Sequence, residues 1–195
     1  IIGLGGVAQA HLQAFDLLPA LNIVAVCDVR QDIAKIIGDK YQAEVYTDYC
    51  SLIQAGGMDL VMVLTPASTH RDIVETVAAA GHHVFCEKPL AVSEEDGEAI
   101  VAACQKAKVK LFYGSCYRYL PAVKKAQELI KSGVIGHVQL MTEQVIGGHG
   151  LAGYRELAPI HYPAGGPGGP GMGLVDHGVH LIDIFSWFTQ SEIIS

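Results

Sequence analysis

The chain has 195 residues, a formal net charge of −7 and an apolar fraction of 50%. This length suits one large domain or two modest ones, and the composition predicts a globular protein with a sizeable core. An acidic balance without any run of Lys or Arg argues against a nucleic-acid surface. Because no apolar run is long enough for a membrane span or a secretory leader, we expect a cytoplasmic protein without nucleic-acid or membrane partners.

The cysteines are odd in number and form no C-x-x-C pair: Cys27, Cys50, Cys86, Cys104 and Cys116. This pattern predicts reduced, mostly buried thiols and suggests neither a disulfide framework nor a zinc site. Cys86 lies beside the candidate site described below, where oxidation or alkylation is the alternative to a buried thiol. The chain does not begin with Met, and residues 192–194 look like the start of a new strand, so we expect a fragment of a longer protein.

The first eight residues carry a glycine-rich turn of the form G-x-G-x-x-A between an apolar pair and a helical pattern. Glycine at the first position permits a tight turn, glycine at the second lets a pyrophosphate approach the backbone, and Ala8 lets the helix pack against its strand. Phosphates would lie at the helix N-terminus, where unpaired N–H groups and the helix dipole favour an anion. The motif predicts dinucleotide binding by Gly3, Gly5, Gly6, Val7 and Ala8.

The context of the glycine turn strengthens this prediction. A helix expected at 7–18 leads into an apolar strand at 23–27, and Asp28 follows, twenty residues after Ala8. A carboxylate at that position accepts hydrogen bonds from ribose hydroxyls and repels a 2′-phosphate, which favours NAD. Arg30, two residues further on, would tolerate that phosphate, so NADP stays as the alternative.

Short apolar runs at 44–46, 60–64, 84–86 and 110–114 alternate with helical patterns at 32–40, 48–55 and 68–81, and a further helix begins at Ser93–Asp96. This alternation predicts an α/β fold: a Rossmann-type parallel sheet with helices on both faces, ending near residue 116. Ser68 is the expected N-cap of the helix that follows the strand at 60–64.

Polar residues follow two of these strands. Thr65 and Pro66 lead to His70, which lies either on the surface or in the crevice at the carboxyl ends of the strands. Glu87, Lys88 and Pro89 follow the next strand, and we expect Lys88 in that crevice, with a solvated surface lysine as the alternative. The Lys88–Pro89 bond is open to a cis conformation.

Beyond residue 116 the pattern changes to a helix at 118–132 and a longer alternating strand at 138–146, which indicates the start of a second α/β domain with one open sheet face. The loop at 147–173 is long enough to be functional or mobile. Candidates in it for contacts with hydroxyl or carboxylate groups are Tyr154, Arg155, His161 and Tyr162.

The last helix, expected at 174–188, places Asp176, His180, Asp183 and Trp187 on one stripe, with apolar residues covering the rest. Such a helix is typically buried, so the stripe needs a partner: solvent in a cleft, a substrate, a metal or a hydrogen-bond network. A structurally satisfied His–Asp pair is the alternative to a functional one.

These motifs resemble, in order and spacing, those of the glucose-fructose oxidoreductase and inositol dehydrogenase family of nicotinamide-dependent enzymes. The matching elements are the glycine turn, Thr65-Pro66 with His70, Cys86-Glu87-Lys88-Pro89 and D-x-G-x-H-x-x-D from Asp176 to Asp183. The resemblance implies a Rossmann domain at 1–116 and an incomplete substrate and oligomerisation domain at 117–195. It also implies hydride transfer between a nicotinamide and a hydroxyl or carbonyl carbon of a sugar, inositol or related polyol, in a homodimer or homotetramer.

The resemblance also implies residue roles. Lys88 would orient the substrate hydroxyl, Asp176 would support His180, and His180 would transfer the proton. Arg118, Tyr162 and Asp183 are expected at the substrate, and Arg30, Thr65, Pro66, His70, Glu87 and Lys88 near the cofactor. Pro170 and Met172 interrupt the glycines before Asp176, and a chain that ends before most of the second sheet would leave the last helix with an exposed apolar surface.

Other readings remain open. One is a non-catalytic dinucleotide-binding sensor. Another is a metal-dependent hydrolase that uses Asp176, His180 and Asp183 with His149 or His161, although the glycine turn would then have no role. A third is a family member that retains its nicotinamide for glycoside cleavage.

Overall fold

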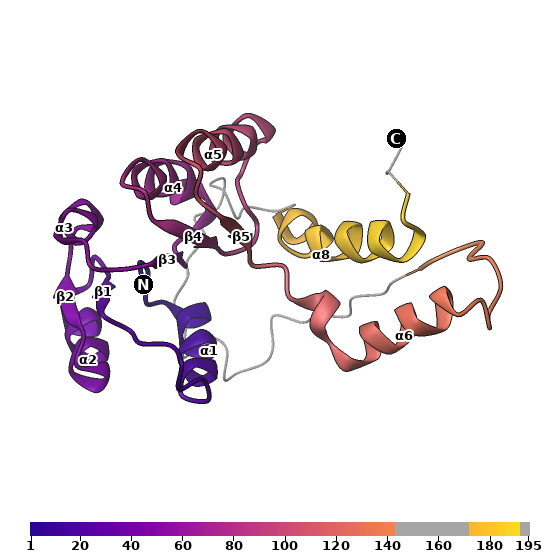
Figure 1. Ribbon diagram of the computed structural model, residues 1–195, viewed down its shortest axis with the longest axis horizontal. Coiled ribbons are helices and arrows are strands. Elements are labelled where there is room, and N and C mark those ends of the chain that lie inside the picture. The colour runs from indigo at the N-terminus through magenta and orange to yellow at the C-terminus, as the bar shows by residue number, and fades with distance from the viewer. Residues whose placement is uncertain (143–171, 192–195) are drawn as a thin grey trace. The chain divides into compact units, whose positions relative to one another are not determined.

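The computed structural model describes residues 1–142 and 172–191, with the backbone alone for 172–177 (Figure 1). The described residues form two compact units, one of residues 1–114 and the other of residues 115–142 together with 172–191. Within these described ranges, the helices are too short or too polar for any of them to cross a membrane.

The first unit is built on a parallel sheet. β1 (Ala25–Cys27) pairs with β2 (Glu44–Tyr46), and β3 (Leu60–Val63) pairs with β4 (His83–Cys86), which pairs with β5 (Leu111–Tyr113). Ile2 forms parallel bridges to Cys27 and to Val63 and so joins the two sets of strands. The resulting spatial order is β2, β1, Ile2, β3, β4, β5. From Ile2, successive strands are added first on one side and then on the other, as in a doubly wound sheet. The predicted Rossmann fold is confirmed.

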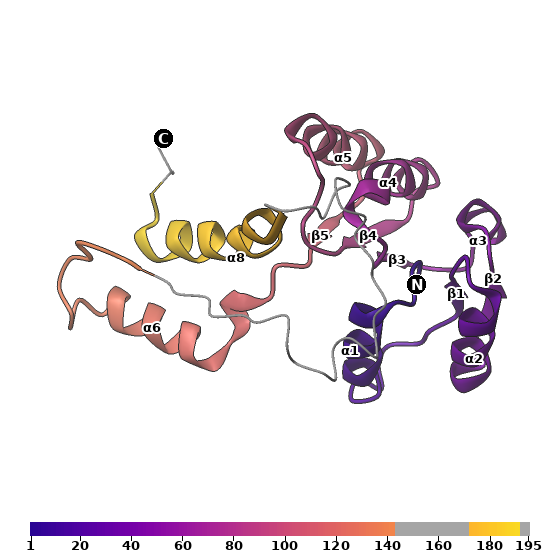
Figure 2. The ribbon, with the colours of Figure 1, turned by 180° about the vertical axis from the view of Figure 1, so that it is seen from behind.

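Helices cover both faces of this sheet, since side chains that alternate along a strand pack into opposite layers. Val26 packs with residues of α1 (Gly6–Phe15) and α2 (Gln31–Tyr41), whereas its neighbours Ala25 and Cys27 pack on the other side. That side is covered by α3 (Tyr49–Ala55), α4 (His70–Ala79) and α5 (Glu94–Ala107). Figures 1 and 2 show α4 and α5 side by side on this face, seen from opposite directions.

Most boundaries in the first unit fall within two residues of those expected, but α1 and α4 differ. α1 ends at Phe15, three residues early, because a residue before proline, here Leu18, avoids the helical region. Ser68 is not an N-cap: it lies inside a 3₁₀ turn, Ala67–Thr69, and α4 begins only at His70. The helix start expected at Ser93 is confirmed, since the Ser93 hydroxyl accepts a hydrogen bond from the Asp96 backbone N–H.

The second unit contains a 3₁₀ turn, Tyr117–Tyr119, and the helices α6 (Pro121–Lys131) and α8 (Met172–Thr189). The strand expected at 138–146 is wrong over residues 138–142, which are not in a strand, and residues 143–146 lie outside the described ranges. An isolated strand leaves its backbone groups unpaired, and no strand is present among the described residues of this unit to pair with it. Of the loop expected at 147–173, residues 147–171 lie outside the described ranges, and residues 172–173 belong to α8 instead.

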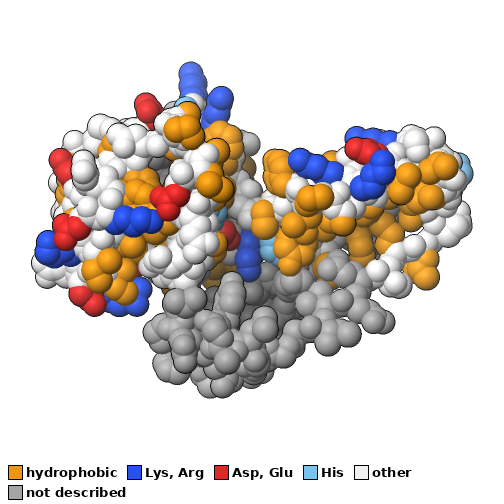
Figure 3. Space-filling view, turned by 90° about the horizontal axis from the view of Figure 1, so that it is seen from below, with side chains coloured by type: hydrophobic (Ala, Val, Ile, Leu, Met, Phe, Trp, Pro, Cys, Tyr) orange, Lys and Arg blue, Asp and Glu red, His pale blue; other side chains and the backbone are white. Residues whose placement is uncertain are grey.

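Hydrophobic side chains gather on the surface of the second unit (Figure 3). The large ones that are most exposed include Tyr119, Leu120, Val134, Ile135, Leu140 and Ile182. The exposed apolar surface expected on the last helix is confirmed for Ile182, which is 57% exposed, but Ile184 on the same helix is only 6% exposed. α8 is therefore covered on one side and bare on another.

The cysteines are all free thiols, as expected, and Cys27, Cys86 and Cys104 are buried. Burial raises the pKa of the Cys27 thiol to about 11 and that of the Cys86 thiol to about 12. Burial is therefore confirmed for Cys86, and the alternative of oxidation or alkylation is wrong, because the side chain lies within the core on one face of the sheet and stays protonated.

Candidate functional site

The glycine turn lies where the sheet order reverses. Gly3 donates its N–H to the Cys27 carbonyl, and the Leu64 N–H donates to the carbonyl of Ile2. Gly3 has a φ of +88°, and a Cβ added there would lie 2.8 Å from the carbonyl carbon of Leu64. Any residue other than glycine would therefore face both backbone strain and a clash with the end of β3. This is the tight turn that the motif predicts.

The start of α1 is arranged for an anion. Gly5 is the N-cap and provides no side-chain cap, and a Cβ built on it meets nothing within 4 Å. The first turn of α1 carries no acidic residue, so no carboxylate of that turn opposes an anion at the N–H groups of Gly6 and Val7. Ala8 is completely buried against Met62 and Leu64, which brings the helix close to the sheet. Open space before an uncapped helix start fits a pyrophosphate.

Asp28, at the end of β1, is a buried carboxylate with defined partners. Its Oδ2 accepts from the Leu4 N–H at 2.8 Å, and its Oδ1 accepts from the backbone N–H and the Nε–H of Arg30 at 2.9 and 3.2 Å. Burial, the largest single influence, raises the pKa of Asp28, but the bonds from Arg30 and Leu4 together outweigh it and hold the pKa below its usual value. Asp28 is thus an ionised acceptor beside the glycine turn, and the half-exposed Arg30 side chain lies against it.

His70 ties two loops together. Its ring is 0% exposed, with Nε2 2.8 Å from the carbonyl oxygen of Thr65 and Nδ1 3.1 Å from that of Leu90. The reading of His70 as a surface residue is therefore wrong. The ring links the segment that follows β3, where Thr65 is half-buried and Pro66 exposed, to the segment that carries Lys88. In this structure His70 reaches the carboxyl edge of the sheet through the backbone of those segments.

Glu87 and Lys88 follow β4 at the same edge. Glu87 is buried: its Oε2 accepts from the Lys88 backbone N–H at 2.6 Å, and its Oε1 lies 3.1 Å from Nε2 of His11. The Lys88–Pro89 bond is cis, one of the two conformations left open by the sequence, and Lys88 is half-buried. His11 was not predicted as a site residue. The signal available in the sequence is a histidine on the helix that follows the glycine turn.

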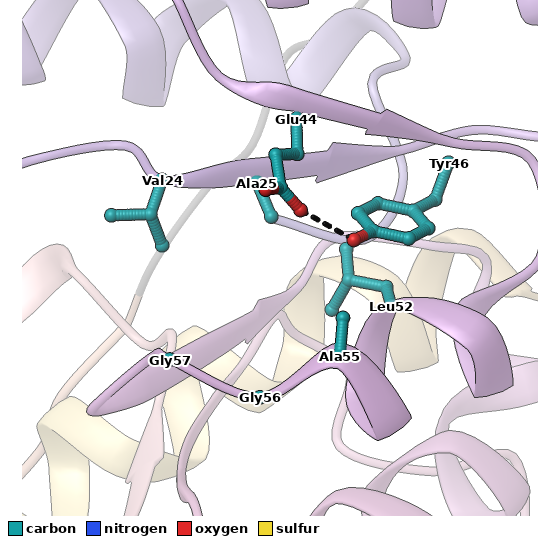
Figure 4. A pocket seen from close by; sticks show the side chains of 8 residues that line it. All are labelled: Val24, Ala25, Glu44, Tyr46, Leu52, Ala55, Gly56 and Gly57. Carbon is teal, nitrogen blue, oxygen red and sulfur yellow. Dashed lines mark hydrogen bonds between the residues drawn. The ribbon is translucent and has the colours of Figure 1, made fainter.

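A pocket in the first unit lies away from the glycine turn and the residues that follow β3 and β4. This pocket has a volume of about 260 Å³ and is lined by residues near the start of β1 and β2 and the end of α3 (Figure 4). Its lining includes Glu44 and Tyr46, whose hydroxyl donates to the Glu44 carboxylate at 2.5 Å. None of the motif residues lines it. The candidate nucleotide site is instead a set of groups that follow the strands at their carboxyl ends, where ligands of open α/β sheets bind.

The second unit contains its own polar cluster around α8. His180 is 3% exposed, and its ring stacks on Tyr117 with the centroids 4.0 Å apart and the planes 3° from parallel. The hydroxyl of Ser115 lies 3.4 Å from Nδ1 of His180 and 3.3 Å from Oδ2 of Asp183. Ser115 and Tyr117 were not predicted, because nothing in the sequence links residues 115–117 to a helix more than sixty residues later.

Arg118 and Asp183, both expected at the substrate, bind each other. The Nε–H and an Nη–H of Arg118 donate to the two carboxylate oxygens of Asp183 at 2.8 and 2.6 Å, and the guanidinium lies 5.5 Å from the ring centre of Trp187. The polar stripe of α8 thus has a hydrogen-bond network as its partner. Within the described ranges, no group of three potential metal ligands is found. The Asp176 side chain lies outside the described residues, as do Tyr154, Arg155, His161 and Tyr162.

Comparison with known proteins finds relatives that are named as dehydrogenases. The D-apiose dehydrogenase of Paraburkholderia graminis is 34% identical over 137 residues, which are 70% of this chain and 36% of that protein. The inositol 2-dehydrogenase of Salmonella paratyphi B is 33% identical over 196 residues, which cover 98% of this chain and 54% of that protein. The chain thus spans about half, or less, of the length of these relatives.

A solved structure agrees with this assignment. An oxidoreductase from Agrobacterium radiobacter, in complex with NAD⁺, L-tartaric acid and magnesium, matches with a TM-score of 0.78 and 27% identity, over 96% of this chain and 53% of that one. The sequence model of an oxidoreductase family with an NAD-binding Rossmann fold matches residues 1–115. This part of the chain contains the glycine turn, Asp28 and Lys88. The chain therefore belongs to this NAD-binding oxidoreductase family, which its motifs resemble.

Proposed function

We propose that the protein is a nicotinamide-dependent dehydrogenase that acts on a hydroxyl-bearing carbon of a sugar, an inositol or a related polyol. The observation that carries this is the glycine turn at the reversal of the sheet, with open space at Gly5 and the Asp28 carboxylate beside it. The printed names of relatives, D-apiose dehydrogenase and inositol 2-dehydrogenase, support the substrate class.

The residues present fit a dinucleotide. The uncapped start of α1 offers backbone N–H groups to the phosphates, and a side chain at Gly5 would fill the space they need. We propose NAD as the preferred form, because an ionised Asp28 accepts from a 2′-hydroxyl and repels a 2′-phosphate. Arg30 tempers this preference: its side chain is half-exposed and only one bond holds it to Asp28, so it is the group that would pair with a 2′-phosphate in NADP.

The proposed catalytic residues are Lys88, Asp176 and His180. The bound nicotinamide supplies the site that accepts or donates a hydride. Lys88 provides a cation that favours negative charge on the substrate oxygen, and His180 takes or returns the hydroxyl proton, since histidine titrates near neutral pH. Asp176 lies one helical turn before His180 and is proposed to stabilise the imidazolium form of its ring. The Glu87 carboxylate accepts a hydrogen bond from the Lys88 backbone N–H and so fixes the backbone from which the lysine side chain extends.

For the intact protein that carries this chain, we further propose a homodimer or homotetramer in the cytoplasm. Exposed apolar side chains on the second unit, such as Leu140, support association, and five free cysteines support a reducing compartment. Analytical ultracentrifugation tests the first statement, and fractionation of the source cells tests the second.

The test of function is a kinetic screen of the intact protein with NAD and NADP against inositols, aldoses, glycosides and sugar acids. Formation of reduced nicotinamide with at least one of these is expected, and Lys88→Met should abolish it while Lys35→Met, which changes an exposed surface lysine, should not. Cofactor binding without turnover of any compound would favour a sensor. Glycoside cleavage without net reduction of the cofactor would favour the glycosidase reading.

A further inference from the structure

Ser115 occupies a central position in the polar cluster of the second unit. It is half-buried, and one oxygen atom lies within hydrogen-bond range of both Asp183 Oδ2 and His180 Nδ1, at 3.3 and 3.4 Å. These distances are long, as is common for catalytic hydrogen bonds in structures without substrate. Ser115 therefore connects an ion-paired carboxylate to the histidine to which we assign proton transfer.

The chemistry of the three groups fixes the direction of this chain of bonds. Asp183 receives two bonds from Arg118 and is a carboxylate, which only accepts hydrogen bonds. The single hydrogen of the Ser115 hydroxyl is therefore donated to Asp183. Towards His180, the same oxygen can then only accept, so the hydrogen of that bond belongs to Nδ1. A neutral imidazole carries one N–H, and its lone pair must then be on Nε2.

We propose that Ser115 is a positioning residue that holds His180 as its Nδ1–H tautomer and so assigns the exchange of the substrate proton to Nε2. This inference rests on the proposed dehydrogenase function. When a substrate hydroxyl is oxidised, its proton passes to Nε2, both ring nitrogens then carry hydrogen, and Nδ1 keeps its bond to Ser115. Asp183 and Arg118 act through Ser115 and do not receive the proton.

The neighbouring contacts restrict the ring to the same orientation. Tyr117, two residues after Ser115, stacks on the His180 ring almost in parallel, and Arg118 fixes Asp183 through two bonds. Stacking limits the ring to rotation within its own plane, and the bond to Ser115 sets that rotation. One short segment, residues 115–118, thus supplies both the hydroxyl near Nδ1 and the ring that stacks on a histidine of α8.

The kinetic test compares Ser115→Ala, Ser115→Thr and the control Ser132→Ala, an exposed serine of the same unit. In the intact protein, Ser115→Ala should lower kcat by roughly 10- to 100-fold, the usual cost of losing a group that orients a reacting histidine. The KM for substrate and the Kd for NADH should change less than about twofold, because Ser115 is assigned to neither. Ser115→Thr keeps the hydroxyl and should recover most of kcat. A loss confined to KM, or no loss, would overturn the proposal.

The tautomer itself is measured by ¹⁵N NMR of the intact protein labelled in its histidine rings, with His180→Gln identifying the resonances. At a pH where His180 is neutral, protonated Nδ1 and unprotonated Nε2 are expected in the wild type, and a shift towards the other tautomer in Ser115→Ala. Protonated Nε2 in the wild type would refute the assignment. If Ser115→Ala fails to fold, the proposal is tested by the tautomer of the wild type and by the kcat of Ser115→Thr. If no compound is oxidised, the proposed function fails, while the NMR result still stands or falls separately.

Discussion

The two candidate sites are held in different ways. In the first unit, the groups proposed to bind the nucleotide are backbone N–H groups and a carboxylate at the ends of buried parallel strands. Backbone hydrogen bonds and the close approach of Gly3 to Leu64 fix this turn against the neighbouring strands. In the second unit, the contacts described for His180 come from side chains: the Ser115 hydroxyl lies near its Nδ1, and the Tyr117 ring stacks on its ring. The first arrangement places a binding site by the fold, whereas the second places a reactive group by a few replaceable contacts.

This contrast predicts that changes in the two regions separate binding from turnover. In the intact protein, His180→Gln should lower kcat by about 100-fold or more, because it removes the proposed proton acceptor. The Kd for NADH should remain within about twofold, since the nucleotide groups belong to the first unit. Steady-state kinetics and calorimetry measure the two. His137→Gln, an exposed histidine of the second unit, is the control, and a His180→Gln enzyme with full turnover would refute the role of this residue.

The second prediction compares two glycines of the first unit that both have a positive φ angle. Gly3 and Gly56 both have positive φ, +88° and +68°, but an added Cβ meets the Leu64 backbone at Gly3 and nothing within 4 Å at Gly56. Gly56→Ala should cost about 1–3 kcal/mol of unfolding free energy from strain alone, because its φ of +68° and ψ of −157° lie in a region that is essentially restricted to glycine. Gly3→Ala should cost about 2 kcal/mol more than that, since backbone cannot easily move away. Urea unfolding of the chain measures both changes in unfolding free energy. Equal losses for the two variants would mean that Gly3 and the Leu64 backbone are not in tight contact.

A third prediction concerns Asp28. Asp28→Asn should weaken NADH binding by about tenfold, as expected for one charged hydrogen bond, and should narrow the preference over NADPH. Asp39→Asn, at an exposed surface pair, is the control. Unchanged affinity in calorimetric titrations of Asp28→Asn would remove this carboxylate from the nucleotide site.

The same residue predicts an effect of pH on stability. Asp28 has a folded-state pKa below its unfolded value, so it stabilises the fold above about pH 4 and loses this contribution as pH falls through the folded-state pKa. The difference in unfolding free energy between wild type and Asp28→Asn should therefore shrink below pH 4. A difference that stays constant from pH 7 to pH 3 would contradict the lowered pKa.

The smallest expected effect is one of thiol reactivity, which compares the core of the first unit with the surface of the second. Cys116 is exposed and should react with iodoacetamide in the native chain at pH 8, whereas Cys27, Cys86 and Cys104 should react only after unfolding. Mass spectrometry of peptides after timed labelling measures each rate. Rapid native labelling of Cys86 would mean that the sheet opens, and its raised pKa would then not protect it.

Most of the first unit could be predicted from the sequence because local patterns and the fold agree there. Uniformly apolar runs, a glycine turn and an acid at a fixed distance specify a parallel sheet and its ligand edge. The burial of His70 was missed, because a histidine in a first helical turn has no sequence feature that reveals two carbonyl partners from separate loops. Burial of Cys86 agrees with the prediction of mostly buried thiols, although a position beside a site says nothing about which face of the strand a side chain takes.

The second unit was predicted less well. The stripe on the last helix gave His180 and Asp183 correctly as polar groups in need of partners, but their partners, Ser115, Tyr117 and Arg118, come from a segment far away in sequence. Arg118 and Asp183 were each assigned to a substrate, whereas the structure pairs them. The strand expected at 138–142 failed because alternation alone does not make a strand without a neighbour to pair with.

The central claim is that the turn at Gly3–Ala8 binds the dinucleotide phosphates. Calorimetric titration of the chain with NADH, for the wild type and Gly5→Val, tests it most directly, with circular dichroism and urea unfolding confirming the fold of each. Because an added Cβ at Gly5 meets nothing within 4 Å, the variant should still fold, with a loss of about 1 kcal/mol from the less favourable N-cap, and yet lose NADH binding by more than about tenfold. A folded wild-type chain that does not bind NADH, or a Gly5→Val variant that binds it equally well, would contradict the account.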